Sequence, residues 1–285
     1  MDKEILILGA NGQLGSDLYQ ECINKKLSVL AWSRQDYDIL HDNITEKLSG
    51  YNFKYILNCI AITNVDGCED NPDLTFNVNT NFAYFLAKYC HEKNIILFHI
   101  STDYVFDGKT NIPYSETDRE SPLNIYGLSK FAGEIAIKNY HDKYFIFRVS
   151  ALFGRAGASG KGGNFITTMQ RLAKELEQVG VIADQITCPT ATVSVAKCIL
   201  SFIEQGVEDY GIYNCVSSNY CSWFDFAHEI FLLSGLDEKK IVPKTFTTYK
   251  FKAHRPKFSA LSINKLQRYY KMPTWQEGLK YYFAK

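Results

Sequence analysis

The feature that most constrains the fold is a glycine-rich turn directly after the first apolar run of the chain. Residues 4–9 read EILILG and residues 9–15 read GANGQLG, which places glycines at 9, 12 and 15. A short run of β-branched and leucine side chains is typical of a strand that is covered on both faces. Glycines that permit a tight turn before an amphipathic helix are typical of a βαβ unit. The sequence therefore predicts a strand, turn and helix whose free N–H groups can hold a phosphate group.

The first half of the chain continues to alternate between strand-like and helix-like segments. Further strands are predicted over 27–33, 55–61, 95–102 and 144–150, and helices over 71–94 and 122–141. Strands that alternate with helices form a parallel sheet with right-handed crossovers and helices on both faces. The sequence thus predicts an α/β protein with a Rossmann-type, doubly wound parallel sheet. Such sheets bind ligands beyond the carboxyl ends of their strands.

Charge and composition exclude several classes of function. Lys plus Arg and Asp plus Glu number 31 each, so the chain has no basic excess for nucleic acid or an anionic membrane surface. No apolar run approaches the roughly 18 residues of a membrane-spanning helix. The eight cysteines are scattered and show neither C-x-x-C nor zinc spacing. We therefore expect reduced thiols, a cytoplasmic protein and no bound metal.

The region after the second strand predicts the cofactor preference. Gly9, Gly12 and Gly15 have the G-x-x-G-x-x-G spacing of short-chain dehydrogenases, so we expect the turn to bind the pyrophosphate of a dinucleotide. The second strand ends with Ser33 and Arg34, where an acid that holds the adenosine ribose is usual. Since an arginine can bind a 2′-phosphate, we expect NADPH rather than NADH, with NADH as an alternative.

A tyrosine and a lysine stand four residues apart in YGLSK, residues 126–130. On a helix this spacing places both side chains on one face, one turn apart. Thr102 precedes them at the carboxyl end of a predicted strand. A phenol has a pKa of about 10, and a neighbouring ammonium group lowers that pKa by favouring the phenolate. We therefore predict that Tyr126 is a general acid, that Lys130 lowers its pKa, and that Thr102 binds a carbonyl oxygen.

These segments, in this order, resemble a known family. The matching segments are ILGANGQLG, NCIAITNVDGCEDNPDLTFNVN, ISTDYVFDG, PYSE, SPLNIYGLSKFAGE, RVSALFG, DQITCPT and RPKFSAL, spread over nearly the whole chain. They are similar to the extended short-chain dehydrogenase/reductase superfamily, and in particular to its dTDP-4-dehydrorhamnose reductases, a group of nucleotide-sugar 4-keto reductases. The resemblance implies reduction of a nucleotide-linked keto sugar for the synthesis of a surface polysaccharide precursor.

The resemblance, together with the patterns above, assigns three sets of residues. The expected catalytic residues are Thr102, Tyr126 and Lys130. The expected cofactor-binding residues are Gly9, Asn11, Gly12, Gln13, Leu14, Gly15, Ser33, Arg34, Asp38, Ile39 and Ala61, with Tyr126 and Lys130 also contacting the cofactor. The expected substrate-binding residues are Asp103, Tyr104, Ala151, Asn164 and Arg255.

The chain departs from the family pattern around the sugar rather than around the cofactor. Ala151 stands where the family usually has a tryptophan, Ile62 where a tyrosine is common, and Cys188 where a glycine is usual. Loss of the tryptophan removes a large stacking surface. The glycine-rich loop at 154–163 is also longer than usual, and the sequence leaves two interpretations open, a surface connector or a lid over the substrate. We therefore expect the redox chemistry to be retained, whereas these changes leave the identity of the sugar open.

The resemblance also implies a division of the chain. We expect a dinucleotide-binding domain over 1–155, to which 190–217 return, and a smaller C-terminal α/β substrate-binding domain over 156–189 and 218–285. A homodimer is plausible from the family. Some relatives hold a metal with carboxylates at the dimer interface, and Asp17 lies near one such position, but the complete set of ligands is missing from this sequence.

Three alternatives to the leading interpretation stay open. The chain could act on a different nucleotide sugar, it could be an epimerase, or it could be a non-catalytic NADP-binding regulatory subunit. The sequence Thr102-Asp103-Tyr104 disfavours a dehydratase, which usually has a glutamate at the third position. The intact set of Thr102, Tyr126 and Lys130 disfavours the regulatory subunit. His99 lies within a predicted strand, and we expect it to be a core residue.

Overall fold

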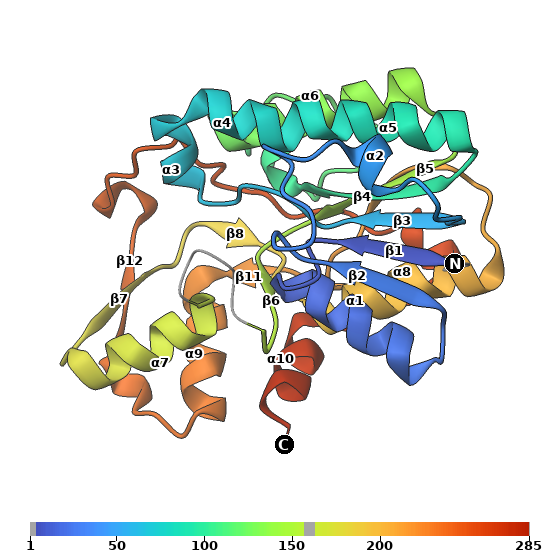
Figure 1. The fold of residues 1–285 in the computed structure, drawn as a ribbon. Coiled ribbons are helices and arrows are strands. Elements are labelled where there is room, and N and C mark those ends of the chain that lie inside the picture. The colour runs from blue at the N-terminus through green and yellow to red at the C-terminus, as the bar shows by residue number, and fades with distance from the viewer. Residues whose placement is uncertain (1–3, 157–162, 285) are drawn as a thin grey trace.

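The central sheet of the protein has six strands, each parallel to its neighbours. The computed structural model describes residues 4–156 and 163–284, and the loop over 154–163, a connector or a lid, falls largely outside these residues (Figure 1). In spatial order the strands are β10 (Gly211–Asn214), β5 (Tyr144–Val149), β4 (Ile96–Thr102), β3 (Tyr55–Asn58), β1 (Ile5–Leu8) and β2 (Val29–Trp32). The predicted doubly wound parallel sheet is confirmed, and the late strand β10 completes it beside β5.

The order of the strands places a topological switch point between β1 and β3. From β1 the chain crosses to β2 on one side and then to β3 on the other. The turns that follow β1 and β3 leave in opposite directions, so they open a crevice at the carboxyl edge of the sheet. Ligands bind in such crevices.

Two layers of helices cover the sheet (Figure 1). Helices α1 (Gln13–Asn24) and α8 (Thr192–Gln205) pack together on one face. Helices α5 (Phe82–Lys93) and α6 (Ile125–Tyr140) pack together on the other. The sequence of β1 explains both layers, because Ile5 and Ile7 pack into the core under α1 and α8, whereas Leu6 and Leu8 pack into the core under α5 and α6.

The helix predicted over 71–94 forms, with a local change of pitch. Helix α4 (Pro72–Phe76) continues into α5 through one π-helical turn, Asn77–Asn81. Such turns are frequent at functional sites. Within it, the buried Asn79 side chain accepts a hydrogen bond from Ile62 N–H at 2.9 Å and donates one to Ile62 C=O at 3.1 Å. Asn79 thereby fixes the loop after β3.

A smaller unit with its own core lies beyond the sheet. Helices α7 (Phe165–Glu175), α9 (Trp223–Leu233) and α10 (Trp275–Phe283) pack around β7 (Val179–Ile182), which pairs in parallel with β12 (Ile241–Lys244). Ser222 and Asp225 form a capping box at the start of α9. The expected domain boundaries themselves stay a prediction.

The remaining α-helices and strands of the described residues are short. They are α2 (Ile44–Lys47), α3 (Val65–Asp70), β6 (Leu152–Phe153), β8 (Ile186–Thr187), β9 (Thr190–Ala191) and β11 (Cys221–Ser222). Strands β6 and β9 pair in parallel, and β8 and β11 pair antiparallel. Within residues 4–156 and 163–284, none of the helices has the length and apolar character needed to cross a membrane.

Candidate active site

A cavity of about 500 Å³ opens at the carboxyl edge of the sheet, next to the switch point. Its walls come from the turn after β1, the segments after β2 and β3, the end of β4 and the start of α6. The predicted residues that line it are Gly9, Asn11, Gly12, Gln13, Leu14, Gly15, Arg34, Asp38, Ile39, Ala61, Tyr126 and Lys130. The fold therefore brings all but one of the expected cofactor residues, and two of the three expected catalytic residues, to one cavity.

Ser33 differs from the other expected cofactor residues because it is absent from the residues that line this cavity. Its backbone N–H and its hydroxyl both donate to Asp36 Oδ2 at 2.8 Å, so its polar groups are used within the turn after β2. Sequence reasoning also missed several lining residues, among them Cys59, Ile60, Thr63, Val78 and Ser101. The sequence signal that could have identified them is their position after β3, at the end of β4 or on the π-helical turn.

The glycine turn after β1 fits a dinucleotide. Gly9 has φ +78°, in the left-handed region that favours glycine. A Cβ atom at Gly15 would overlap the carbonyl oxygen of Gly9, so helix α1 can start close to β1 only with glycine there. Gly12 caps α1 without a side-chain hydrogen bond, and no acidic residue occupies the first turn. The N-terminus of α1 thus presents unneutralised N–H groups to the cavity, which suits a pyrophosphate.

We expect Gly15→Ala to weaken dinucleotide binding and to destabilise the fold. The added methyl group meets backbone atoms that cannot rotate away, and overpacking of this kind typically costs about 1–3 kcal/mol. NADPH titration and chemical unfolding measure the two effects. Gly180→Ala in β7 is the control, since the nearest atoms to its Cβ belong to the side chains of Lys244 and Tyr249 and not to the backbone. Wild-type NADPH affinity in Gly15→Ala would contradict the assignment of the turn.

The start of α6 positions the expected proton donor. The side chain of Asn124 caps the helix by accepting from Gly127 N–H at 2.8 Å, and its amide donates to His254 C=O at 2.6 Å. Tyr126 therefore lies in the first turn of the helix, and Lys130 follows one turn later. Gly127 permits this packing, because a Cβ atom there would overlap the carbonyl oxygen of Tyr104.

Burial, rather than an ion pair, dominates the electrostatics of Tyr126. Burial raises the pKa of the Tyr126 phenol, and its interaction with the Thr102 hydroxyl opposes that rise. The expectation that Lys130 lowers the pKa of Tyr126 is not met in this structure. The Lys130 amine instead lies 3.0 Å from Nε2 of His99, and burial lowers the pKa of Lys130 to about 8.

The residues that follow Thr102 lie beside the catalytic tyrosine. Asp103 is buried, and it accepts hydrogen bonds from the hydroxyls of Thr102 at 3.1 Å and Ser150 at 2.8 Å. Burial raises the pKa of Asp103 to about 6, and these hydroxyls oppose the rise. The rings of Tyr104 and Tyr126 pack edge to face at 5.9 Å. Neither residue is among those that line the cavity, and contact of Asp103 and Tyr104 with a substrate stays a prediction.

The other expected substrate residues hold segments together in this structure. Ala151 has φ +42°, which is uncommon for a residue other than glycine. Asn164 caps α7 and donates to the Gly154 carbonyl at 2.8 Å. Arg255 donates to Asp66 Oδ2 at 2.6 Å and lies over the ring of Phe251 at 4.1 Å. Their roles in substrate binding stay predictions.

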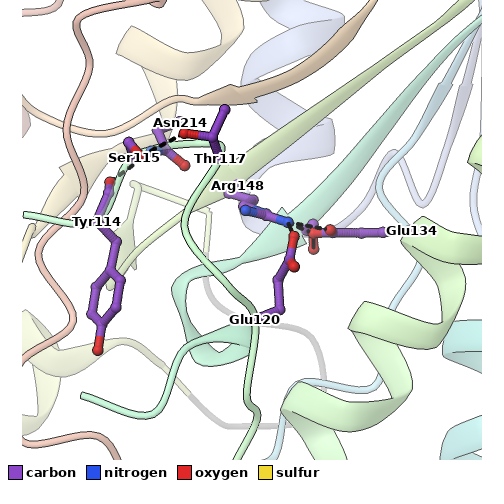
Figure 2. A network of polar contacts seen from close by, with 8 residues as sticks. Tyr114, Ser115, Thr117, Glu120, Glu134, Arg148 and Asn214 are labelled. Atoms are coloured by element: carbon purple, nitrogen blue, oxygen red, sulfur yellow. Dashed lines mark hydrogen bonds and ion pairs between the residues drawn. The ribbon is translucent and has the colours of Figure 1, made fainter. Parts of the chain in front are cut away.

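A buried ionic network, which sequence reasoning missed, fixes α6 to the sheet (Figure 2). Arg148 on β5 is fully buried and pairs with Glu134 of α6 at 2.6 Å and with Glu120 at 2.5 Å. The hydroxyl of Ser101 on β4 also donates to Glu134, at 2.5 Å. Glu134 lies one helical turn after Lys130, so this network holds the catalytic face of α6 against β4 and β5. The arginine within the apolar run YFIFRVS was the only signal.

In the part of the chain that the structure describes, no three His, Cys, Asp or Glu side chains gather into a group that could hold a metal ion. Asp17 instead accepts a hydrogen bond from the hydroxyl of Thr192.

Comparisons with known proteins agree with this site. The RmlD substrate binding domain family matches residues 3–285. The dTDP-4-dehydrorhamnose reductase of Escherichia coli K12 is 34% identical over 293 residues, which cover 97% of this chain and 95% of that protein. The spore coat polysaccharide biosynthesis protein SpsK of Bacillus subtilis is 34% identical over 281 residues, which cover 98% of this chain and 96% of that protein.

Solved structures show the same similarity. The crystal structure of dTDP-4-dehydrorhamnose reductase from Bacillus anthracis in complex with NADP superposes with a TM-score of 0.91 and 36% identity, over 99% of both chains. That of a dTDP-4-dehydrorhamnose reductase from Clostridium acetobutylicum superposes with a TM-score of 0.90 and 36% identity, over 99% of this chain and 98% of that chain. The predicted family is confirmed, and this chain belongs to the RmlD substrate binding domain family.

Proposed function

We propose that this protein is an NADPH-dependent reductase of a nucleotide-linked keto sugar, either dTDP-4-dehydrorhamnose or a close analogue. The observation that carries the proposal is the convergence of the glycine turn, Tyr126 and Lys130 on one cavity, with Thr102 beside Tyr126. Relatives of similar length named dTDP-4-dehydrorhamnose reductase support the substrate class. The relative named for spore coat polysaccharide biosynthesis supports a product used in a surface polysaccharide.

The residues of this chain supply the acid chemistry. NADPH, held by the glycine turn and Arg34, would supply a hydride to the ketone carbon. The Thr102 hydroxyl, which donates to Asp103 in this structure, would turn to donate to the ketone oxygen, and Tyr126 transfers its phenolic proton to that oxygen as negative charge develops on it. The raised pKa of Tyr126 suits this role, because the phenol stays protonated at neutral pH.

Arg34 carries the expected preference for NADPH. It is exposed and lines the cavity beside Asp38 and Ile39. Because hydrogen bonds to charged groups contribute about 1.5–3 kcal/mol, we expect Arg34→Ala to weaken NADPH binding about tenfold to a hundredfold. Binding of NADH, which lacks the 2′-phosphate, should change much less. Fluorescence titration with both cofactors measures this, with Arg171→Ala on α7 as the control. An equal loss for both cofactors would contradict recognition of the 2′-phosphate.

NADPH oxidation in the presence of dTDP-4-dehydrorhamnose and a panel of other nucleotide keto sugars tests the proposal. We expect one NADPH to be consumed for each sugar that is reduced. Turnover of another sugar alone would mean that Ala151, Ile62 and Cys188 have changed the sugar pocket. Conversion of a sugar without net NADPH consumption would indicate an epimerase. Tight NADPH binding with no turnover of any sugar would favour the regulatory subunit.

The compartment and the assembly belong to the same proposal. None of the eight cysteines, all of which lie in the described part of the chain, forms a disulfide bond, and seven of them are buried, which supports a reducing compartment such as the cytoplasm. A homodimer is the assembly that we expect, and sedimentation velocity measures it.

A further inference from the structure

Three buried polar side chains lie in series behind the cavity. Lys130 of α6 places Nζ 3.0 Å from Nε2 of His99 on β4, and Nδ1 of His99 lies 3.1 Å from Nδ2 of Asn58 at the end of β3. Each of the three residues is 1% exposed. Asn58 and His99 are buried and do not line the cavity, so their polar atoms must find their hydrogen-bond partners within the protein. The hydrogen-bonding pattern therefore determines which atoms carry protons.

The backbone fixes the orientation of the Asn58 amide. Oδ1 of Asn58 accepts a hydrogen bond from Ile60 N–H at 3.1 Å. The other end of the amide, which faces His99, is therefore the NH₂ group, and that group only donates. Nδ1 of His99 must accept, so it carries no proton.

The tautomer of His99 follows from this orientation. Burial is the main cause that lowers the pKa of His99 well below its ordinary value, and a positive charge on Lys130 would lower it further, so the ring is neutral. A neutral imidazole carries one proton, and with Nδ1 accepting, that proton lies on Nε2. Nε2–H then points at Nζ of Lys130. An ammonium group has only donors, whereas an uncharged amine has a lone pair that can accept.

The opposite arrangement loses a hydrogen bond. An ammonium group at Lys130 would need Nε2 as its acceptor, which moves the imidazole proton to Nδ1. The amide of Asn58 would then have to turn so that Oδ1 accepts from Nδ1–H. Ile60 N–H would face the NH₂ group, and a buried donor would be left without its partner.

We infer that His99 is a positioning residue that sets the protonation state of Lys130: Asn58 holds the imidazole as its Nε2–H tautomer, and that tautomer stabilises the uncharged amine of Lys130. The other titratable groups that act on Lys130 are Glu134, one turn along α6, and Cys59 after β3, and both favour the ammonium. The carboxylate of Glu134 is shared with Arg148, which limits its pull on Lys130. Lys130 can thus exchange its proton near neutral pH. Only the consequence for catalysis rests on the proposed reductase function.

The variant Asn58→Asp reverses the tautomer with little change of shape. One carboxylate oxygen accepts from Ile60 N–H, and the other accepts from Nδ1–H of His99. Nε2 is then free to accept from a Lys130 ammonium. We expect the titration midpoint of Lys130 to rise by about one to two pH units, the size of one hydrogen bond to a charged group.

Nuclear magnetic resonance measures both the tautomer of His99 and the titration midpoint of Lys130, and neither measurement needs a substrate. Nitrogen-15 shifts of the His99 ring report which nitrogen is protonated, and carbon-13 shifts of the lysine side chains report the Lys130 midpoint. We expect Nε2–H in the wild type and Nδ1–H in Asn58→Asp, with the higher Lys130 midpoint. His141→Asn is the control, because His141 is also buried but bonds to Ile95 C=O, and it should leave Lys130 unchanged.

Two results would overturn the inference. One is Nδ1–H in wild-type His99. The other is an unchanged Lys130 midpoint in an Asn58→Asp protein whose tautomer has switched. If Asn58→Asp does not fold, the wild-type tautomer alone decides. Neither measurement requires the protein to turn over a sugar. Failure of the proposed reductase activity is therefore distinguishable from failure of this inference.

Discussion

Replacement of Tyr126 by phenylalanine should lower kcat about 100-fold to 10,000-fold, the range that a positioned general acid typically contributes. The phenylalanine keeps the ring that packs against Tyr104 and removes only the hydroxyl that gives up the proton. The ketone oxygen would then have to take its proton from water. Because the glycine turn is unchanged, NADPH affinity should stay within a few-fold of wild type. Steady-state kinetics and NADPH titration on the same preparation separate the two effects.

The control for Tyr126→Phe is Tyr140→Phe at the last residue of the same helix. Tyr140 is exposed and is not among the residues that line the cavity, so the kcat of Tyr140→Phe should equal that of the wild type. If the Tyr126→Phe protein keeps the wild-type kcat, Tyr126 is not the proton donor. Another group at the cavity would then have to supply the proton.

Replacement of Arg148 by methionine should lower the free energy of unfolding by about 3–5 kcal/mol, the usual cost of removing one partner of a buried ion pair. Glu134 is 0% exposed, and of the hydrogen bonds described above it would keep only the one from the Ser101 hydroxyl. Chemical unfolding at 25 °C measures the loss. The matched control is Arg171→Met, whose exposed pair with Glu175 should contribute about 0–1 kcal/mol.

A double variant tests whether the loss comes from the unpaired charge. Glu134→Gln keeps an oxygen that accepts from Ser101 and removes the buried charge. Arg148→Met combined with Glu134→Gln should therefore be more stable than Arg148→Met alone, since the two sites are coupled. If Arg148→Met costs less than about 1 kcal/mol, or if the second change brings no recovery, the network does not stabilise α6 as argued.

The sheet and the position of the catalytic helix could be predicted from local sequence patterns. The apolar run before Gly9 and the Tyr126–Lys130 spacing each depend on residues that are close in the chain. A strand, a turn and a helix face follow from such patterns because backbone geometry is local. The carboxyl edge of the sheet then follows from the parallel order of the strands, which locates the cavity.

The contacts that tune the site could not be predicted in this way. Lys130 meets His99 across 31 residues, and Asn164 meets Gln13 across 151 residues. These contacts depend on which strands are neighbours and on how closely α6 and α7 pack, and no local pattern encodes that. The same limit explains why the expected effect of Lys130 on the pKa of Tyr126 is not found in the structure. Spacing on a helix indicated proximity to Lys130, but burial and the competing contact with His99 emerge only from the fold.

The most direct test of the central claim follows the hydride itself. The protein is given dTDP-4-dehydrorhamnose, or the panel sugar that it turns over, with NADPH that carries deuterium at the transferable position of the nicotinamide ring. We predict one deuterium in each product molecule, bound to the former ketone carbon, and one oxidised cofactor for each product. Mass spectrometry and proton magnetic resonance locate the label. A product without deuterium at that carbon, or formed without net oxidation of the cofactor, would contradict the account.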